Sequence, residues 1–236
     1  LALACVAALG VIFSAPWSQE AVEAIAGTWP AQFRTIAIAS TAVPVAIAVL
    51  VAILKIRDRR ALRYSLLALA LGIGAAYVVL GAVGFGEAFH FVEYGVLAVL
   101  FYRACAALGD GAAVALPLLA CTIVGFIDEW FQWFIPIRTG ELRDVLLNVV
   151  ASSCGLLLAI AIQPPSRLTL SRGPRTRRLI GATAVVTALV AAAFVATLRA
   201  GHEIRDDEVG SFPSRYSQAR SEEHTSELQS RFGISY

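Results

Sequence analysis

The sequence predicts an all-α fold, a polytopic bundle of about seven transmembrane helices. Of its 236 residues, 58% are hydrophobic and only 15% are charged, which is far from the composition of a soluble domain. Its apolar stretches reach about 20 residues, the length that a helix needs to cross ~30 Å of hydrocarbon. The net charge of +2 is small and the arginines are grouped in short connectors. This pattern is typical of membrane orientation and excludes nucleic acid as an expected partner.

Seven apolar segments are expected to form the helices. The chain starts at Leu1 and contains no Met, so the first segment is expected to be clipped. Pro44 and Pro117 lie in the middle of the second and fifth segments, where a proline kinks a helix. The segments cover residues 1–15, 35–54, 65–84, 88–106, 112–134, 145–162 and 179–198.

The connectors alternate in charge, which predicts the orientation. Residues 55–63 are strongly basic, Arg103 marks the next short link on that side, and residues 167–178 hold five arginines. Cytoplasmic loops carry an excess of Lys and Arg, so these connectors are expected in the cytoplasm, together with the N-terminus. The other connectors, at residues 17–34, 83–87 and 135–143, and the tail after Arg199 then face outward.

The chain is expected to consist of one helical domain followed by a tail. Residues 1–199 form the transmembrane domain and residues 200–219 an extracytoplasmic tail. Residues 220–230 read RSEEHTSELQS, which resembles the in-frame translation of a sequencing-library adapter. Residues 220–236 are therefore expected to be non-native and are excluded from the fold, as a fusion scar would be.

Eight polar or charged side chains lie in or beside the fourth, fifth and sixth segments, all on the side expected to face outward. They are His90, Glu93, Asp128, Glu129, Gln132, Arg138, Asp144 and Asn148. Ionisable groups at membrane depth cost roughly 2.5–3.5 kcal/mol each and are functional sites by default. Spacings of three or four residues place neighbours on one helix face. The three helices are therefore expected to turn these side chains toward each other, in one outer-leaflet binding pocket.

Each residue taken singly also has a structural role that competes with this shared pocket. His90 alone would be an interfacial hydrogen-bonding residue, and Arg138 a solvated or headgroup-bound one. Asp144 suits the N-terminus of the sixth helix, and Asn148 can bond between helices. Glu129 is the hardest to explain in this way, because it lies inside an apolar span beside a second acid. The shared pocket is the preferred interpretation.

Three stretches of sequence carry a resemblance to a known family. They read HFVEYGVLAVLFYRA at residues 90–104, DEWFQWFIPIRTGELRDVLLN at residues 128–148, and Gly155. In this order they resemble the VanZ-like family of bacterial membrane proteins, over residues 65–162. The resemblance maps the family's motif residues onto Phe91 and onto the side chains named above, with the exception of Glu93. Ala151 departs from the family, which often has a glycine there.

The resemblance implies a multi-pass protein of the bacterial cell (inner or plasma) membrane. The founding member of the family is associated with low-level resistance to the glycopeptide teicoplanin. The first hypothesis is therefore a non-catalytic envelope protein whose pocket binds a membrane lipid or a lipid-linked or lipid-tailed envelope molecule, with Arg138 engaging an anionic group.

Two other functions use the same residues. A membrane-embedded hydrolase or transferase acting on lipid-linked substrates would use Glu129 or Asp128 as general base and His90 as acid or base. Ion translocation is disfavoured, because the cytoplasmic halves of these segments are apolar. No cofactor or metal is expected, since no compact motif such as His-Glu-x-x-His is present. The residues leave the choice between binding and catalysis open.

Overall fold

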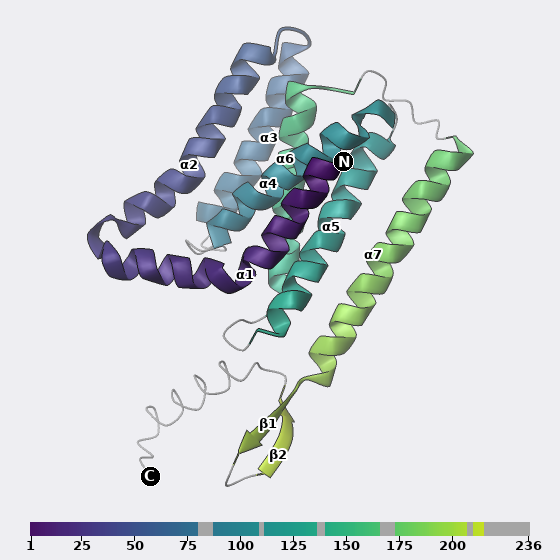
Figure 1. The fold of residues 1–236 in the computed structure, drawn as a ribbon. Coiled ribbons are helices and arrows are strands. Elements are labelled where there is room, and N and C mark those ends of the chain that lie inside the picture. Colours follow the sequence, from purple (N-terminus) through teal and green to yellow (C-terminus); the bar gives the residue numbers. More distant parts are fainter. Residues whose placement is uncertain (80–86, 109–110, 136–139, 166–172, 207–209, 215–236) are drawn as a thin grey trace.

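The computed structural model describes residues 1–79, 87–108, 111–135, 140–165, 173–206 and 210–214. Seven α-helices occupy most of this part of the chain, in an all-helical body with a small hairpin beyond its last helix (Figure 1). The elements are α1 (Ala2–Thr28), α2 (Pro30–Lys55), α3 (Arg60–Val79), α4 (Glu87–Cys105), the 3₁₀ turn η1 (Ala106–Leu108), α5 (Ala112–Trp133), α6 (Leu142–Ile162), α7 (Pro174–Ala200), β1 (His202–Asp206) and β2 (Gly210–Ser214).

The predicted membrane-spanning bundle is confirmed, with a slightly different count. Among the described residues, five helices are long and apolar enough to cross a bilayer, namely α2, α4 with η1, α5, α6 and α7. The bent helix α1 is a sixth candidate. The predicted third span, residues 65–84, coincides with α3 as far as Val79, and its remaining residues lie outside the described part.

The connector expected at residues 17–34 is helical. Helix α1 continues to Thr28 and α2 begins at Pro30. The two straight parts of α1, Ala2–Ser18 and Glu20–Thr28, meet at an angle of 54°. Pro16 inside the helix explains the bend, because its ring lacks an N–H and crowds the preceding turn. The second part of α1 then runs toward the start of α2 (Figure 1).

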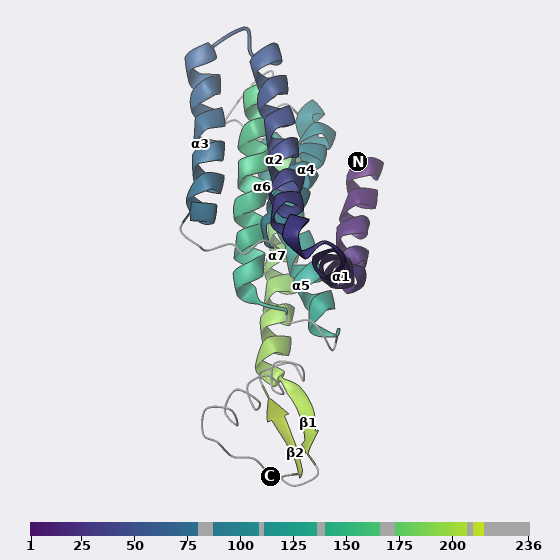
Figure 2. The same cartoon turned by 90° about the vertical axis from the view of Figure 1, so that its left-hand side faces the viewer.

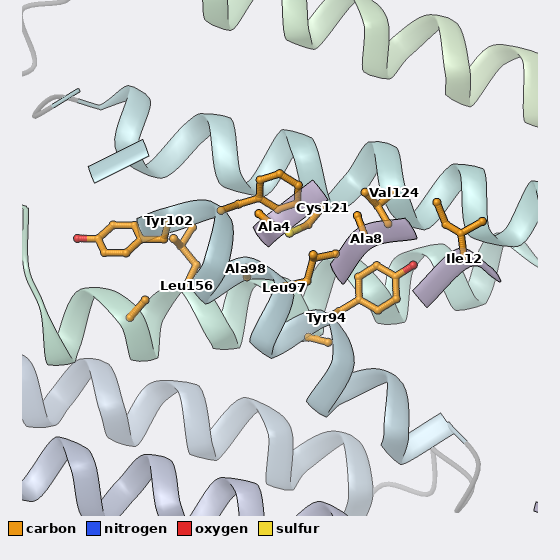
Figure 3. Close-up of a cluster of buried hydrophobic side chains, with 13 residues drawn as sticks. Ala4, Ala8, Ile12, Tyr94, Leu97, Ala98, Tyr102, Cys121, Val124 and Leu156 are labelled. Atoms are coloured by element: carbon orange, nitrogen blue, oxygen red, sulfur yellow. The ribbon is translucent and has the colours of Figure 1, made fainter. Parts of the chain in front are cut away.

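Helices α4, α5 and α6 pack against one another and form the centre of the bundle. Helix α3 lies against α6, and α7 lies against α5 (Figure 2). The first part of α1 covers α4 and α5, where Ala4, Ala8 and Ile12 contribute one face to the main apolar core (Figure 3). In the most apolar stretch of α2 and of α7, only 6% of the residues are buried against the rest of the protein. This is expected for helices whose faces contact lipid.

Helices α4 and α6 approach each other most closely at two glycines. A Cβ added to Gly155 would overlap the carbonyl oxygen of Gly95 and lie 2.6 Å from its Cα. Small residues of this kind let membrane helices pack backbone to backbone. One turn away, the carbonyl oxygen of Ala151 is 3.9 Å from a Cβ placed on Gly95. Ala151 is itself fully buried at this contact.

The C-terminal end of α6 is fixed by two neighbouring helices. The guanidinium of Arg63, in the first turn of α3, donates from Nε to the carbonyl of Ala161 (2.6 Å) and from Nη2 to that of Ile162 (2.5 Å). The hydroxyl of Tyr102 on α4 donates to the carbonyl of Gln163 at 2.7 Å. The last carbonyls of a helix have no partner within the helix. Arg63, which was expected as part of a basic connector, is therefore a buried structural residue.

The tail after α7 contains an antiparallel hairpin, in which His202 pairs with Ser214 and Asp206 with Gly210. No strand was expected there. The hairpin lies within residues 200–219, outside the helical bundle (Figure 1). Residues 220–236 lie outside the described part of the chain.

Candidate functional site

Seven of the eight predicted site residues lie in described helices, and all seven are at one end of the bundle. His90 and Glu93 are in the N-terminal half of α4, and Asp144 and Asn148 are in the N-terminal half of α6. The other three, Asp128, Glu129 and Gln132, are near the C-terminus of α5, which runs antiparallel to both (Figure 1). Arg138 falls in residues 136–139, outside the described residues.

A buried hydrogen bond joins α4 to α5 at this end. The Tyr94 hydroxyl donates to Oδ2 of Asp128 at 3.0 Å, and both residues are buried, with 0% and 1% of their surface exposed. The His90 ring stacks beside Tyr94, with 6.2 Å between ring centres and 24° between planes. Tyr94 was missed in the sequence. Its position one helical turn from His90 was the available signal, since a buried tyrosine usually finds a partner for its hydroxyl.

Glu129 holds the connector between α5 and α6. Its carboxylate accepts one hydrogen bond from Nε2 of Gln132 and one from the backbone N–H of Glu141, each at 3.2 Å. Gly140 lies so close to the Glu129 carbonyl that a Cβ at position 140 would overlap it. Each oxygen of the side chain accepts one of these two hydrogen bonds. Glu129 thus helps to fix the start of α6 to the end of α5.

Asn148 lies where α4, α5 and α6 meet. A Cβ placed on Gly125 of α5 would be 3.4 Å from Asn148 Cβ, 3.6 Å from its Nδ2 and 3.7 Å from a ring carbon of Tyr94. Asn148 is only 1% exposed, yet neither Oδ1 nor Nδ2 makes a hydrogen bond to any described residue. Gly125 was a second residue missed in the sequence. A methyl group at this position would meet the asparagine and the tyrosine at ordinary van der Waals distance.

The predicted residues divide into a buried and a half-buried set. Asp128, Glu129, Gln132 and Asn148 are buried, whereas His90, Glu93 and Asp144 are half-buried at the same end. Glu93 and Glu129 both lie within electrostatic range of the Tyr94 hydroxyl. In the described part of the chain, no three His, Cys, Asp or Glu side chains are arranged to hold a metal ion.

Two further polar groups of the site are buried without a good hydrogen bond to a described residue. The Ser152 hydroxyl, one turn along α6 from Asn148, lies against the Cys121 thiol of α5. The second group is the indole N–H of Trp130, a residue that packs against the cluster of Phe126, Val145 and Phe194. Buried polar groups of proteins are nearly always bonded, so this end of the bundle has hydrogen-bonding capacity that its described residues leave unused.

Comparison with known proteins gives one match. No curated protein and no solved structure is significantly similar to the chain. A sequence model of the VanZ/LLP1 family matches residues 2–163, a range that contains all eight predicted site residues and extends well beyond residues 65–162 toward the N-terminus. The helices α1 to α6, and the polar cluster they enclose, therefore fall within the family's own region. This chain belongs to the VanZ/LLP1 family and is a multi-span membrane protein.

Proposed function

We propose that this protein binds a lipid-linked or lipid-tailed molecule of the bacterial cell envelope at the polar end of its bundle, and that it contributes to teicoplanin resistance. The observation that carries the proposal is the buried cluster of Asp128, Glu129 and Asn148 inside membrane-spanning helices. Polar groups at such depth are expensive and mark ligand sites. A lipid tail could lie along the apolar helix faces while its polar head reaches this cluster.

Arg138 is the proposed contact for an anionic headgroup. The residues that flank its segment are both held at the end of α5. The N–H of Ile135 donates to the carbonyl of Gln132 at 3.0 Å, and Gly140 packs on Glu129. Because Ile135 and Gly140 both lie at the polar end of the bundle, they support the proposal that Arg138 acts close to the membrane surface. Guanidinium groups bind phosphate and carboxylate bidentately.

The proposal requires the polar end to face outward, with the basic connectors and the N-terminus in the cytoplasm of a bacterial cell. In a variant without the four native cysteines, single cysteines replace exposed Leu142 at the polar end and exposed Asp58 at the basic end. A membrane-impermeant maleimide applied to intact cells is expected to label Leu142→Cys and to leave Asp58→Cys unlabelled until the cells are lysed. The reverse pattern contradicts the orientation.

The resistance role is tested by expressing the full chain in a glycopeptide-susceptible Gram-positive host. The inhibitory concentration of teicoplanin, which carries an acyl tail, is expected to rise, and that of vancomycin, which has none, is expected to stay unchanged. His90→Ala and Glu129→Gln should lose the effect, whereas Glu20→Gln, at an exposed position in α1, serves as the matched control. Equal susceptibility of cells with and without the wild-type protein eliminates the resistance role.

Binding is favoured over catalysis by the way the acids are bonded. Glu129 accepts two hydrogen bonds and Asp128 is bonded to Tyr94. These contacts favour a fixed recognition surface over a base that must gain and lose a proton. Incubation of the purified protein with a radiolabelled polyprenyl-linked sugar tests this directly. Substrate recovered intact supports binding, while release of labelled sugar would assign a hydrolase or transferase to the same site.

A further inference from the structure

We propose that Asn148 forms an internal binding site for an uncharged hydroxyl group, at the junction of α4, α5 and α6. The hydroxyl comes either from a water molecule or from the sugar of a lipid-linked ligand. Only the second source rests on the proposed function. The shared chemistry is one O–H group that donates a hydrogen bond and accepts another.

The first argument is the unused hydrogen-bonding capacity of Asn148. Its side chain is 1% exposed, and both amide atoms lack a hydrogen-bond partner among the described residues. A buried amide without partners is strongly destabilising, and most such groups in proteins are bonded to protein or to ordered water. A leucine at this position would have avoided the problem. The amide is therefore expected to meet a partner that the described part of the chain does not provide.

The second argument is that four residues packed around Asn148, namely Gly125, Tyr94, Val145 and Ala151, offer it no hydrogen-bonding group. Gly125, directly opposite on α5, has no side chain. The Tyr94 hydroxyl already donates to Asp128. On α6 itself, Val145 and Ala151 on either side of Asn148 are apolar and fully buried. None of these residues has a hydrogen-bond donor to spare for Oδ1.

The third argument concerns the charge of the bound group. The amide needs a donor for Oδ1 and an acceptor for Nδ2. A metal cation accepts nothing from Nδ2. A carboxylate or a phosphate dianion offers no donor and would also lie near Asp128, one helical turn from Gly125, and near Glu129. A neutral hydroxyl satisfies both amide atoms without adding a charge to a region that already contains two carboxyl groups.

The position of the site also indicates its route of access. Along α5, the residues from Asp128 to Gln132 lead from the site to the polar end of the bundle. Toward the other end, Tyr94 borders a continuous apolar core that includes Leu97 and Val124 (Figure 3). A hydroxyl therefore reaches Asn148 from the polar end of the bundle.

The test compares thermal unfolding of the purified full chain in lipid nanodiscs with that of two variants. Asn148→Leu replaces the amide by an apolar group of similar size. Gly125→Ala places a methyl group beside the amide, at ordinary van der Waals distance from Asn148 and Tyr94. Gly74→Ala is the control, because its Cβ would also make only an ordinary contact, 3.8 Å from Phe91. The probes are polyprenyl phosphate and polyprenyl-phosphoryl hexose.

If the site holds water, Asn148→Leu and Gly125→Ala both lower the Tm by about 2–4 °C or more without any probe, and Gly74→Ala does not. If it takes the sugar hydroxyl, Asn148→Leu raises the Tm without probe. In the wild type, the hexose lipid then raises the Tm more than polyprenyl phosphate does, and in Asn148→Leu this difference disappears. Either result supports the site.

The inference is overturned if Asn148→Leu raises the Tm without probe and the hexose lipid raises the wild-type Tm no more than polyprenyl phosphate does. It is equally overturned if Asn148→Leu raises the Tm without probe and the extra Tm rise from the hexose lipid is as large in this variant as in the wild type. It is also overturned if Asn148→Leu alone lowers the Tm while Gly125→Ala behaves like Gly74→Ala, since that pattern is a packing effect. The proposed function fails separately, when neither lipid raises the Tm of the wild type. The comparison of the unliganded variants still decides the water source in that case.

Discussion

The Tyr94 hydroxyl donates a hydrogen bond to Asp128 at 3.0 Å, across the interface of α4 and α5 and out of contact with solvent. The bond connects the two helices at the end where the polar residues of α6 also lie. It gives the acid of one membrane-spanning helix a defined partner on the next. The same tyrosine contacts His90 and the Gly125–Asn148 junction, which makes it the central residue of the cluster.

Tyr94→Phe is expected to destabilise the protein while preserving its packing. The ring remains, but Asp128 loses a buried donor, at a cost of about 1–2 kcal/mol. Thermal unfolding in detergent measures the effect. Tyr77→Phe is the matched control, because Tyr77 contacts Phe91 through its ring. Equal stability of Tyr94→Phe and wild type would show that the Tyr94–Asp128 hydrogen bond does not stabilise the folded protein.

Glu129→Gln is expected to loosen the start of α6. The new amide presents a donor where the carboxylate accepted bonds from Gln132 and from the N–H of Glu141. Loss of a hydrogen bond to a charged group costs about 1.5–3 kcal/mol, so exchange of the Glu141 amide hydrogen should accelerate about tenfold or more. Hydrogen exchange followed by mass spectrometry measures it. Glu20→Gln should leave this rate unchanged, and unaltered exchange in Glu129→Gln would contradict the assignment.

Gly155→Ala is expected to force α4 and α6 apart. The added methyl group would overlap the backbone of Gly95, and overpacking of this kind typically costs about 1–3 kcal/mol. Gly181→Ala is the control, since nothing lies within 4 Å of a Cβ at that position of α7. It should be neutral or slightly stabilising, because alanine favours helix more than glycine does. Unfolding temperatures that shift equally in both variants would rule out the close contact.

Arg63→Ala is expected to destabilise the opposite end of the bundle. The guanidinium donates to two terminal carbonyls of α6, and charge-assisted bonds of this type contribute about 1.5–3 kcal/mol. Arg63→Lys should recover only part of the loss, because an ammonium lacks the planar fork of guanidinium. Arg57→Ala, in the exposed connector, controls for the change of charge. Comparable unfolding temperatures for Arg57→Ala and Arg63→Ala would remove the capping role.

The sequence located most of the candidate site, for a physical reason. Acids and amides inside apolar spans, such as Glu129 and Asn148, stand out because their burial is costly, and their spacing indicates the face they share. Tyr94 and Gly125 were not found, because a tyrosine or glycine in an apolar helix carries no comparable signal. Their importance depends on which helix lies opposite.

The helical class, the approximate number of spans and the family resemblance were determined by the sequence alone, because hydropathy and segment length express the cost of exposing a peptide chain to lipid. The continuation of α1 to Thr28, the hairpin at residues 202–214 and the capping role of Arg63 were decided only by the tertiary structure. They depend on partners distant in sequence or on local geometry that composition does not encode. The pairing of Tyr94 with Asp128 was likewise decided only by the tertiary structure, because a hydrogen bond between two helices exists only after packing has fixed their rotation.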